Sequence, residues 1–73
     1  MKIIEVNGKQ VKTNLNENYS RLPDDMLADA LPFGMTEEKY LKQLVDMGYT
    51  KVTFYYATTR VRGYHKIFVK CKK

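Results

Sequence analysis

The sequence has few of the residues on which catalysis, metal binding and cross-linking depend. It has no tryptophan, one cysteine (Cys71) and one histidine (His65) among 73 residues. A single cysteine excludes a disulfide within the chain, and one cysteine with one histidine is too small a ligand set for a zinc site. Adjacent Asp24 and Asp25 suit a helix start better than an acid/base pair. We therefore expect no metal, no cofactor, no small-molecule substrate and no enzymatic activity, with Cys71 packed as a small apolar side chain.

Long hydrophobic runs are also missing. No apolar stretch approaches the ~20 residues that a membrane-spanning helix needs. The first five residues include Lys2 and Glu5 where a signal peptide would have an apolar stretch. These features predict a cytoplasmic protein with no membrane partner. A chain of this length buries only ~60% of its unfolded surface, which predicts a single domain over residues 1–73 with one thin core.

Acidic residues are absent from the C-terminal third of the chain. Residues 1–50 contain six Lys or Arg and eight Asp or Glu, a net charge of −2, whereas residues 51–73 contain seven Lys or Arg and no acid, a net charge of +7. Such an asymmetry predicts a surface that faces a polyanion. The alternative is a solvated face that only keeps the protein soluble.

The N-terminal residues predict a β-hairpin. Asn-Gly at positions 7 and 8 favours a two-residue type I′ turn between strands over residues 2–6 and 9–13. The register fixed by this turn places Ile4 opposite Val11, so that both face the core.

The middle of the chain predicts one or two helices. Pro23, followed by two acids and an apolar stripe, indicates a helix of about two turns, or a structured turn, that ends at Pro32. Thr36 is a plausible N-cap, and the stripe after it predicts a longer helix over residues 36–47, ended by Gly48.

From Lys51 onward, polar and apolar residues alternate with the period of a β-strand. A four-residue loop over residues 60–63 makes every pair on one face apolar. These pairs are Tyr56 with Ile67, Phe54 with Val69, and Val52 with Cys71. We therefore expect a small α+β domain of order ββ(α)αββ, a four-stranded antiparallel sheet with one or two helices packed on one face and the other face open to solvent.

The same register gathers aromatic rings and cations on the open face of this C-terminal hairpin. The candidate binding residues are Tyr55, Arg60, Arg62, Tyr64, Lys66, Phe68 and Lys70. Lys and Arg neutralise phosphates, and aromatic rings stack on unpaired bases for ~1–3 kcal/mol each. This surface predicts a small basic module that binds DNA or RNA largely by shape and charge. The helix over residues 36–47 has a net charge of −1 with two glutamates at its N-terminal end, so we assign the interaction to the hairpin.

Other hypotheses fit the same residues. Aromatic residues are common in strands for packing alone, and lysines protect edge strands from aggregation. A small inhibitor or adaptor, of the kind that phages or mobile elements encode, would bind a host protein through the open face or through the acidic residues 17–46, whose net charge is −4. Formation of a homodimer through an exposed strand edge is a third hypothesis.

Overall fold

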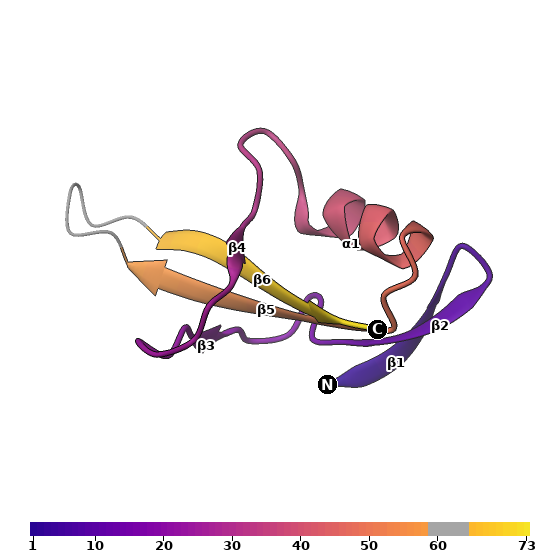
Figure 1. The fold of residues 1–73 in the computed structure, drawn as a ribbon, viewed down its shortest axis with the longest axis horizontal. Helices are drawn as coiled ribbons and strands as arrows, with labels where there is room; N and C mark the ends of the chain where they lie inside the picture. The colour runs from indigo at the N-terminus through magenta and orange to yellow at the C-terminus, as the bar shows by residue number, and fades with distance from the viewer. Residues whose placement is uncertain (59–64) are drawn as a thin grey trace.

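The computed structural model describes residues 1–58 and 65–73, in which one helix packs on one face of a mixed six-stranded sheet (Figure 1). The elements in chain order are β1 (Lys2–Val6), β2 (Lys9–Thr13), β3 (Ser20–Arg21), β4 (Asp29–Ala30), α1 (Glu37–Asp46), β5 (Lys51–Thr58) and β6 (His65–Lys72). The strand order is β1-β2-β5-β6-β4, and β3 also pairs with β5. The protein is therefore a small α+β domain, as predicted, but its sheet differs from the expected one.

Both predicted hairpins have the predicted register. In the first, Asn7 and Gly8 adopt φ angles of 53° and 78°, as a type I′ turn requires, and Ile4 lies opposite Val11. In the second, the apolar pairs are Tyr56 with Ile67, Phe54 with Val69 and Val52 with Cys71. The proposed loop over residues 60–63 lies outside the described residues.

The two hairpins are joined by a parallel pairing, and this corrects the expectation of a four-stranded antiparallel sheet. Thr13 of β2 lies beside Val52 of β5, and the two strands run in the same direction. Parallel neighbours need a long crossover connection, which residues 14–50 supply with α1. Farther along the same edge of β5, β3 is also parallel, with Ser20 beside Tyr55.

The side chain of Asn14 bridges the break between β2 and β3. Its Oδ1 accepts from the backbone N–H of Phe54 at 2.8 Å, and its Nδ2 donates to the carbonyl of Phe54 at 2.9 Å. Asn14 is buried, so both polar groups of its amide satisfy backbone groups that water does not reach. One side chain thus substitutes for the strand backbone that is missing from this part of the ladder.

The short helix expected after Pro23 is wrong, whereas the alternative of a structured turn is confirmed, because the N–H of Met26 donates to the carbonyl of Pro23 at 3.1 Å. Residues 23–28 form a connection without helix, here called the strap, which runs from β3 at the β5 edge of the hairpin to β4 at the β6 edge. It passes below β5 and β6, on the sheet face opposite α1, hereafter the outer face (Figure 1). A helix of two turns is unstable alone. Extended backbone instead bonds to the hairpin edges, with Leu22 donating to the carbonyl of Tyr56 at 2.8 Å and Leu31 to that of Ile67 at 2.9 Å.

The longer helix is confirmed, and α1 is the helix that the described residues contain. Thr36 caps it by accepting from the N–H of Lys39 at 3.2 Å, and Gly48 follows its end with φ 101°. Its buried face packs on the sheet. The buried apolar residues of the core are Val6, Val11, Leu15, Leu41, Leu44, Val45, Val52, Phe54 and Val69. No helix in the described residues is long and apolar enough to cross a membrane.

Candidate functional site

Three lysines lie side by side on the outer face, across three neighbouring strands. Lys12 of β2 is the register partner of Lys51 of β5, which in turn is the partner of Lys72 of β6. Each of the three lysines is exposed. Their sequence neighbours, such as the fully buried Val11 and Val52, point to the opposite face of the sheet, which α1 covers. Since neighbouring strands are ~4.8 Å apart, these three residues, here called the lysine row, place three cations within about 10 Å.

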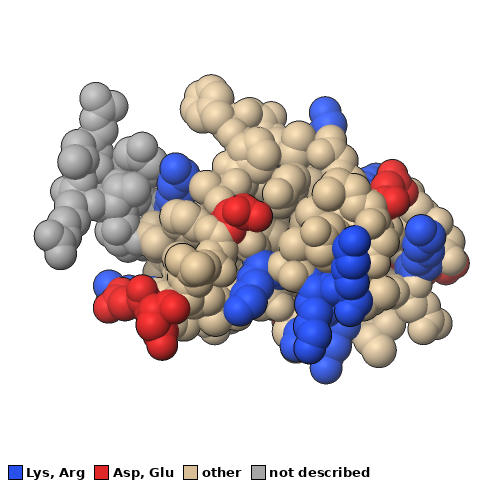
Figure 2. All heavy atoms as spheres, viewed as in Figure 1, with Lys and Arg blue, Asp and Glu red and all other residues tan. Residues whose placement is uncertain are grey.

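A fourth cation extends the row along β6. Lys70 is exposed and pairs with Thr53, one step along the same face. Figure 2 shows lysine or arginine side chains gathered where β5 begins and β6 ends. The four residues Lys12, Lys51, Lys70 and Lys72 are called the lysine cluster below.

No ion pair in the described part of the chain involves the lysine cluster, although two acids, Asp25 and Asp29, line pockets beside Lys70. In the described ranges 1–58 and 65–73, the ion pairs are Lys42 with Glu38 at 3.8 Å and the terminal amine with Glu17 at 3.5 Å, and neither involves the cluster. Like charges directly opposite each other across strands are destabilising. The fold therefore holds a repulsive arrangement that a bound polyanion would relieve.

The strap partly closes the outer face beside these lysines. Met26 shares a shallow pocket of about 210 Å³ with Thr53, Tyr55 and three members of the lysine cluster. Tyr55 and Phe68 are half-buried. The expectation that the second face is open to solvent therefore holds at the exposed lysines and is corrected beside Tyr55, because the connection between β3 and β4 crosses the face there.

The residues predicted from the sequence have different placements. Tyr55 and Phe68 lie opposite each other, as the register argument predicts, and are flanked by Ser20 and Ala30 on the outer strands. Lys66 and Lys70 are exposed on β6, four residues apart and so ~13 Å apart along the strand. The remaining three predicted residues, Arg60, Arg62 and Tyr64, lie outside the described residues.

Sequence reasoning missed three members of the lysine cluster. Alternation already placed Lys51 and Lys72 on the same face as Tyr55, so this signal was available. No sequence signal places Lys12 beside Lys51, because its position depends on the parallel pairing of β2 with β5.

Other polar and titratable groups do not form a second site in the described part of the chain. No group of three or more His, Cys, Asp or Glu side chains there could hold a metal. Burial raises the pKa of Tyr19, whose ring stacks on Phe54 at 5.5 Å, and burial followed by the charge of Asp29 raises the pKa of Tyr40. Both tyrosines pack against the core and stay protonated at neutral pH, so they serve as packing residues.

Comparisons with protein families, with curated proteins and with solved structures gave no match to this chain. The geometry of the outer face is therefore the basis on which a function can be inferred.

Proposed function

We propose that this protein binds nucleic acid through the lysine cluster, largely by contacts to the phosphate backbone. The observation that carries the proposal is the lysine row, in which three cations occupy matching positions on three strands and none of them forms an ion pair within the described residues. Phosphates spaced along a nucleic-acid backbone complement such a line of charges, and their binding releases condensed counterions.

The position of the strap favours backbone contacts over base stacking. Tyr55 and Phe68 are half-buried, so less ring surface is available to an unpaired base than the sequence suggested. The binding mode that we propose thus depends on shape and charge. Lys66 belongs to the proposed surface, and Arg60, Arg62 and Tyr64 remain candidates from the sequence.

A salt titration tests this proposal. Four phosphate contacts give a slope of roughly −3.6 in log K against log salt, or about a hundredfold loss of affinity between about 50 and about 200 mM salt. We would measure it by fluorescence anisotropy with labelled single- and double-stranded oligonucleotides. The absence of binding at low salt, or binding that does not depend on salt, would exclude the proposal.

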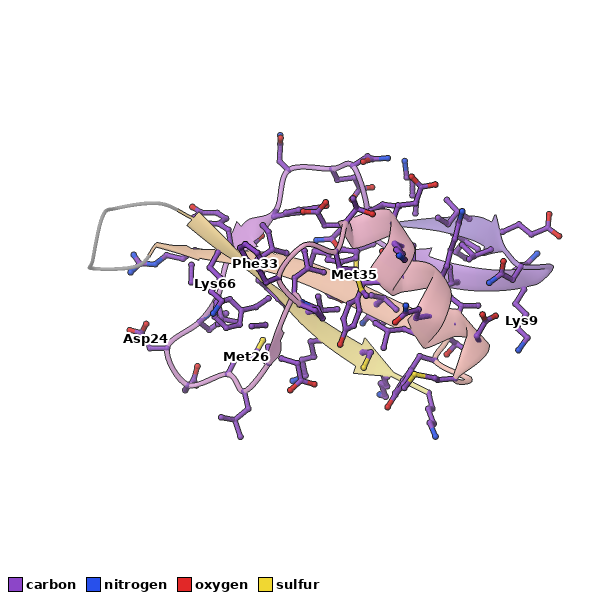
Figure 3. All side chains as sticks on the ribbon, turned by 90° about the horizontal axis from the view of Figure 1, so that it is seen from above. Lys9, Asp24, Met26, Phe33, Met35 and Lys66 are labelled. Atoms are coloured by element: carbon purple, nitrogen blue, oxygen red, sulfur yellow. The ribbon has the colours of Figure 1, made fainter. Side chains whose placement is uncertain are left out.

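A matched pair of triple variants locates the site. Replacing the lysine row (Lys12→Gln, Lys51→Gln, Lys72→Gln) should reduce the salt slope by about 3, since each lost phosphate contact lowers it by ~1. The control removes the same charge elsewhere (Lys9→Gln, Lys39→Gln, Lys42→Gln), at the β1–β2 turn and on α1. Figure 3 shows Lys9 at the end of the molecule opposite Lys66. Equal losses in the two triple variants would place the site elsewhere.

A second candidate function is supported by two exposed apolar side chains. Leu27 and Phe33 are 92% and 108% exposed and lie on either side of β4. Large exposed apolar side chains serve as anchors in protein interfaces. Leu27 and Phe33 both belong to the acidic residues 17–46, through which a small inhibitor or adaptor would bind a host protein. A stoichiometric partner that survives nuclease and high salt, and that a Leu27→Ser, Phe33→Ser variant no longer captures, would favour this function.

A further inference from the structure

Strand β1 is an outer strand of the sheet, and β2 is its neighbour among the described residues. The type I′ turn makes Val6 and Lys9 a hydrogen-bonded pair, because the carbonyl of the first turn residue accepts from the N–H of the fourth. Hydrogen-bonded pairs alternate with non-hydrogen-bonded pairs along the ladder. The N–H and carbonyl groups of Ile3 and Glu5 therefore point away from β2, towards the free edge.

The two outer edges of the sheet differ in how they are protected. On one side, β4 is only two residues long, and Pro32 follows two residues later. On the other side, β1 has five residues, no proline and an unbroken register with β2. Its Ile3 side chain is 65% exposed. Natural sheets protect edge strands by shortening or interrupting them or by placing charged side chains on them. β1 is neither short nor interrupted, and its charges are the oppositely charged Lys2 and Glu5.

We propose that two copies of this chain pair antiparallel through β1 and form one continuous sheet. The outward groups of Ile3 and Glu5 leave two registers, with Ile3 opposite either Ile3 or Glu5 of the second copy, because the third would set two Glu5 charges directly opposite each other. Residues directly opposite each other in an antiparallel pair point to the same face. Both registers therefore pair odd-numbered residues with each other and turn the two outer faces to the same side.

This pairing would combine the lysine rows of both copies, and this consequence rests on the nucleic-acid binding proposed above. Ile3 is the register partner of Lys12, so the row of one copy runs across β1 towards the second copy. Seven strand spacings separate Lys72 of the two copies, or ~34 Å, close to one turn of a DNA duplex at ~34–36 Å. The two Lys12 residues are three spacings apart, or ~14 Å, beyond the Debye length of ~8 Å at physiological salt.

The mass in solution tests the pairing. Sedimentation velocity over a range of concentrations should show a species of twice the 8.6 kDa chain mass. Ile3→Pro removes an N–H that points away from β2, so it should abolish the dimer and keep the β1–β2 ladder. The control, Ile3→Thr, retains that N–H and a β-branched side chain and should remain dimeric. A wild-type chain that stays monomeric at every concentration, or an Ile3→Pro variant that stays dimeric, would overturn the proposal.

Amide hydrogen exchange gives a second measurement that needs no variant. The N–H groups of Ile3 and Glu5 should become more protected as the concentration rises, whereas those of Ile4 and Val6 should be protected throughout. Protection of Ile3 and Glu5 that does not change with concentration would contradict the pairing.

The two proposals fail in different ways. A monomer that still binds oligonucleotides with a steep salt dependence would remove the dimer and leave the lysine cluster as the site. A dimer that binds no oligonucleotide would remove the nucleic-acid function and with it the combined lysine surface. Both proposals would be supported if the wild-type chain is a dimer and the lysine-row triple variant still dimerises but no longer binds oligonucleotides.

Discussion

On the sheet face that α1 covers, Val11, Val52 and Phe54 are fully buried, whereas on the outer face Lys12 and Lys51 are exposed. The residues come from the same strands and alternate along them. Because neighbouring positions point to opposite faces, stability and binding can be altered separately by substitutions one residue apart. The fully buried apolar side chains thus lie on one face, and the exposed lysines of the same strands lie on the other.

The largest effect should come from the centre of the core. Phe54→Ala should lower the free energy of unfolding by about 3–5 kcal/mol, since it removes a fully buried ring that stacks on Tyr19. This is a large part of the ~4–11 kcal/mol expected for a chain of this size. Urea denaturation measures it. Tyr55→Ala, at a half-buried position on the outer face, should lower the free energy of unfolding clearly less. An equal decrease would mean that both faces stabilise the fold alike.

Substitution of Asn14 should have the next largest effect on the free energy of unfolding, because its side chain forms hydrogen bonds with the backbone N–H and carbonyl of the buried Phe54. Asn14→Leu leaves the N–H and carbonyl of Phe54 without these partners, which should lower the free energy of unfolding by about 2–4 kcal/mol. Asn18→Ala, at an exposed position in the same connection, serves as the control and should change it by less than about 0.5 kcal/mol. A small effect of the Asn14 substitution would mean that water or a backbone shift replaces the bridge.

The smallest expected effect is an increase, not a decrease, in the free energy of unfolding. Lys51→Gln removes the middle charge of the lysine row, so it should raise the free energy of unfolding by about 0.2–1 kcal/mol at low salt. The gain should vanish near 1 M salt, where the Debye length is ~3 Å. The same variant should bind oligonucleotides more weakly than the control Lys39→Gln. A destabilised Lys51→Gln protein would show that the row supports the fold.

Local signals predicted the parts of the fold that depend on neighbours in sequence. The Asn-Gly turn, the N-cap at Thr36 and the alternation after Lys51 were sufficient for both hairpins and α1. The parallel pairing of Thr13 with Val52 joins residues far apart in the chain, and no local pattern encodes it.

The misread part was the connection between the two hairpins. Its apolar stripe has the spacing of a short helix, yet Leu27 is exposed and Ala30 lies in a strand beside Phe68. The edges of β5 and β6 offered backbone hydrogen bonds that a two-turn helix could not match. One of the four lysines of the candidate site was missed for the same reason, since Lys12 joins Lys51 only through long-range pairing.

Residues before β5 surround the C-terminal hairpin on all sides. β2 and β3 line one edge, the strap crosses the outer face, β4 lines the other edge and α1 covers the remaining face. The core contacts of the earlier segments with Val52, Phe54 and Val69 therefore require the paired β5 and β6. We expect folding to be a single cooperative and comparatively slow event, in which the rest of the chain packs against the paired hairpin through contacts between residues far apart in sequence.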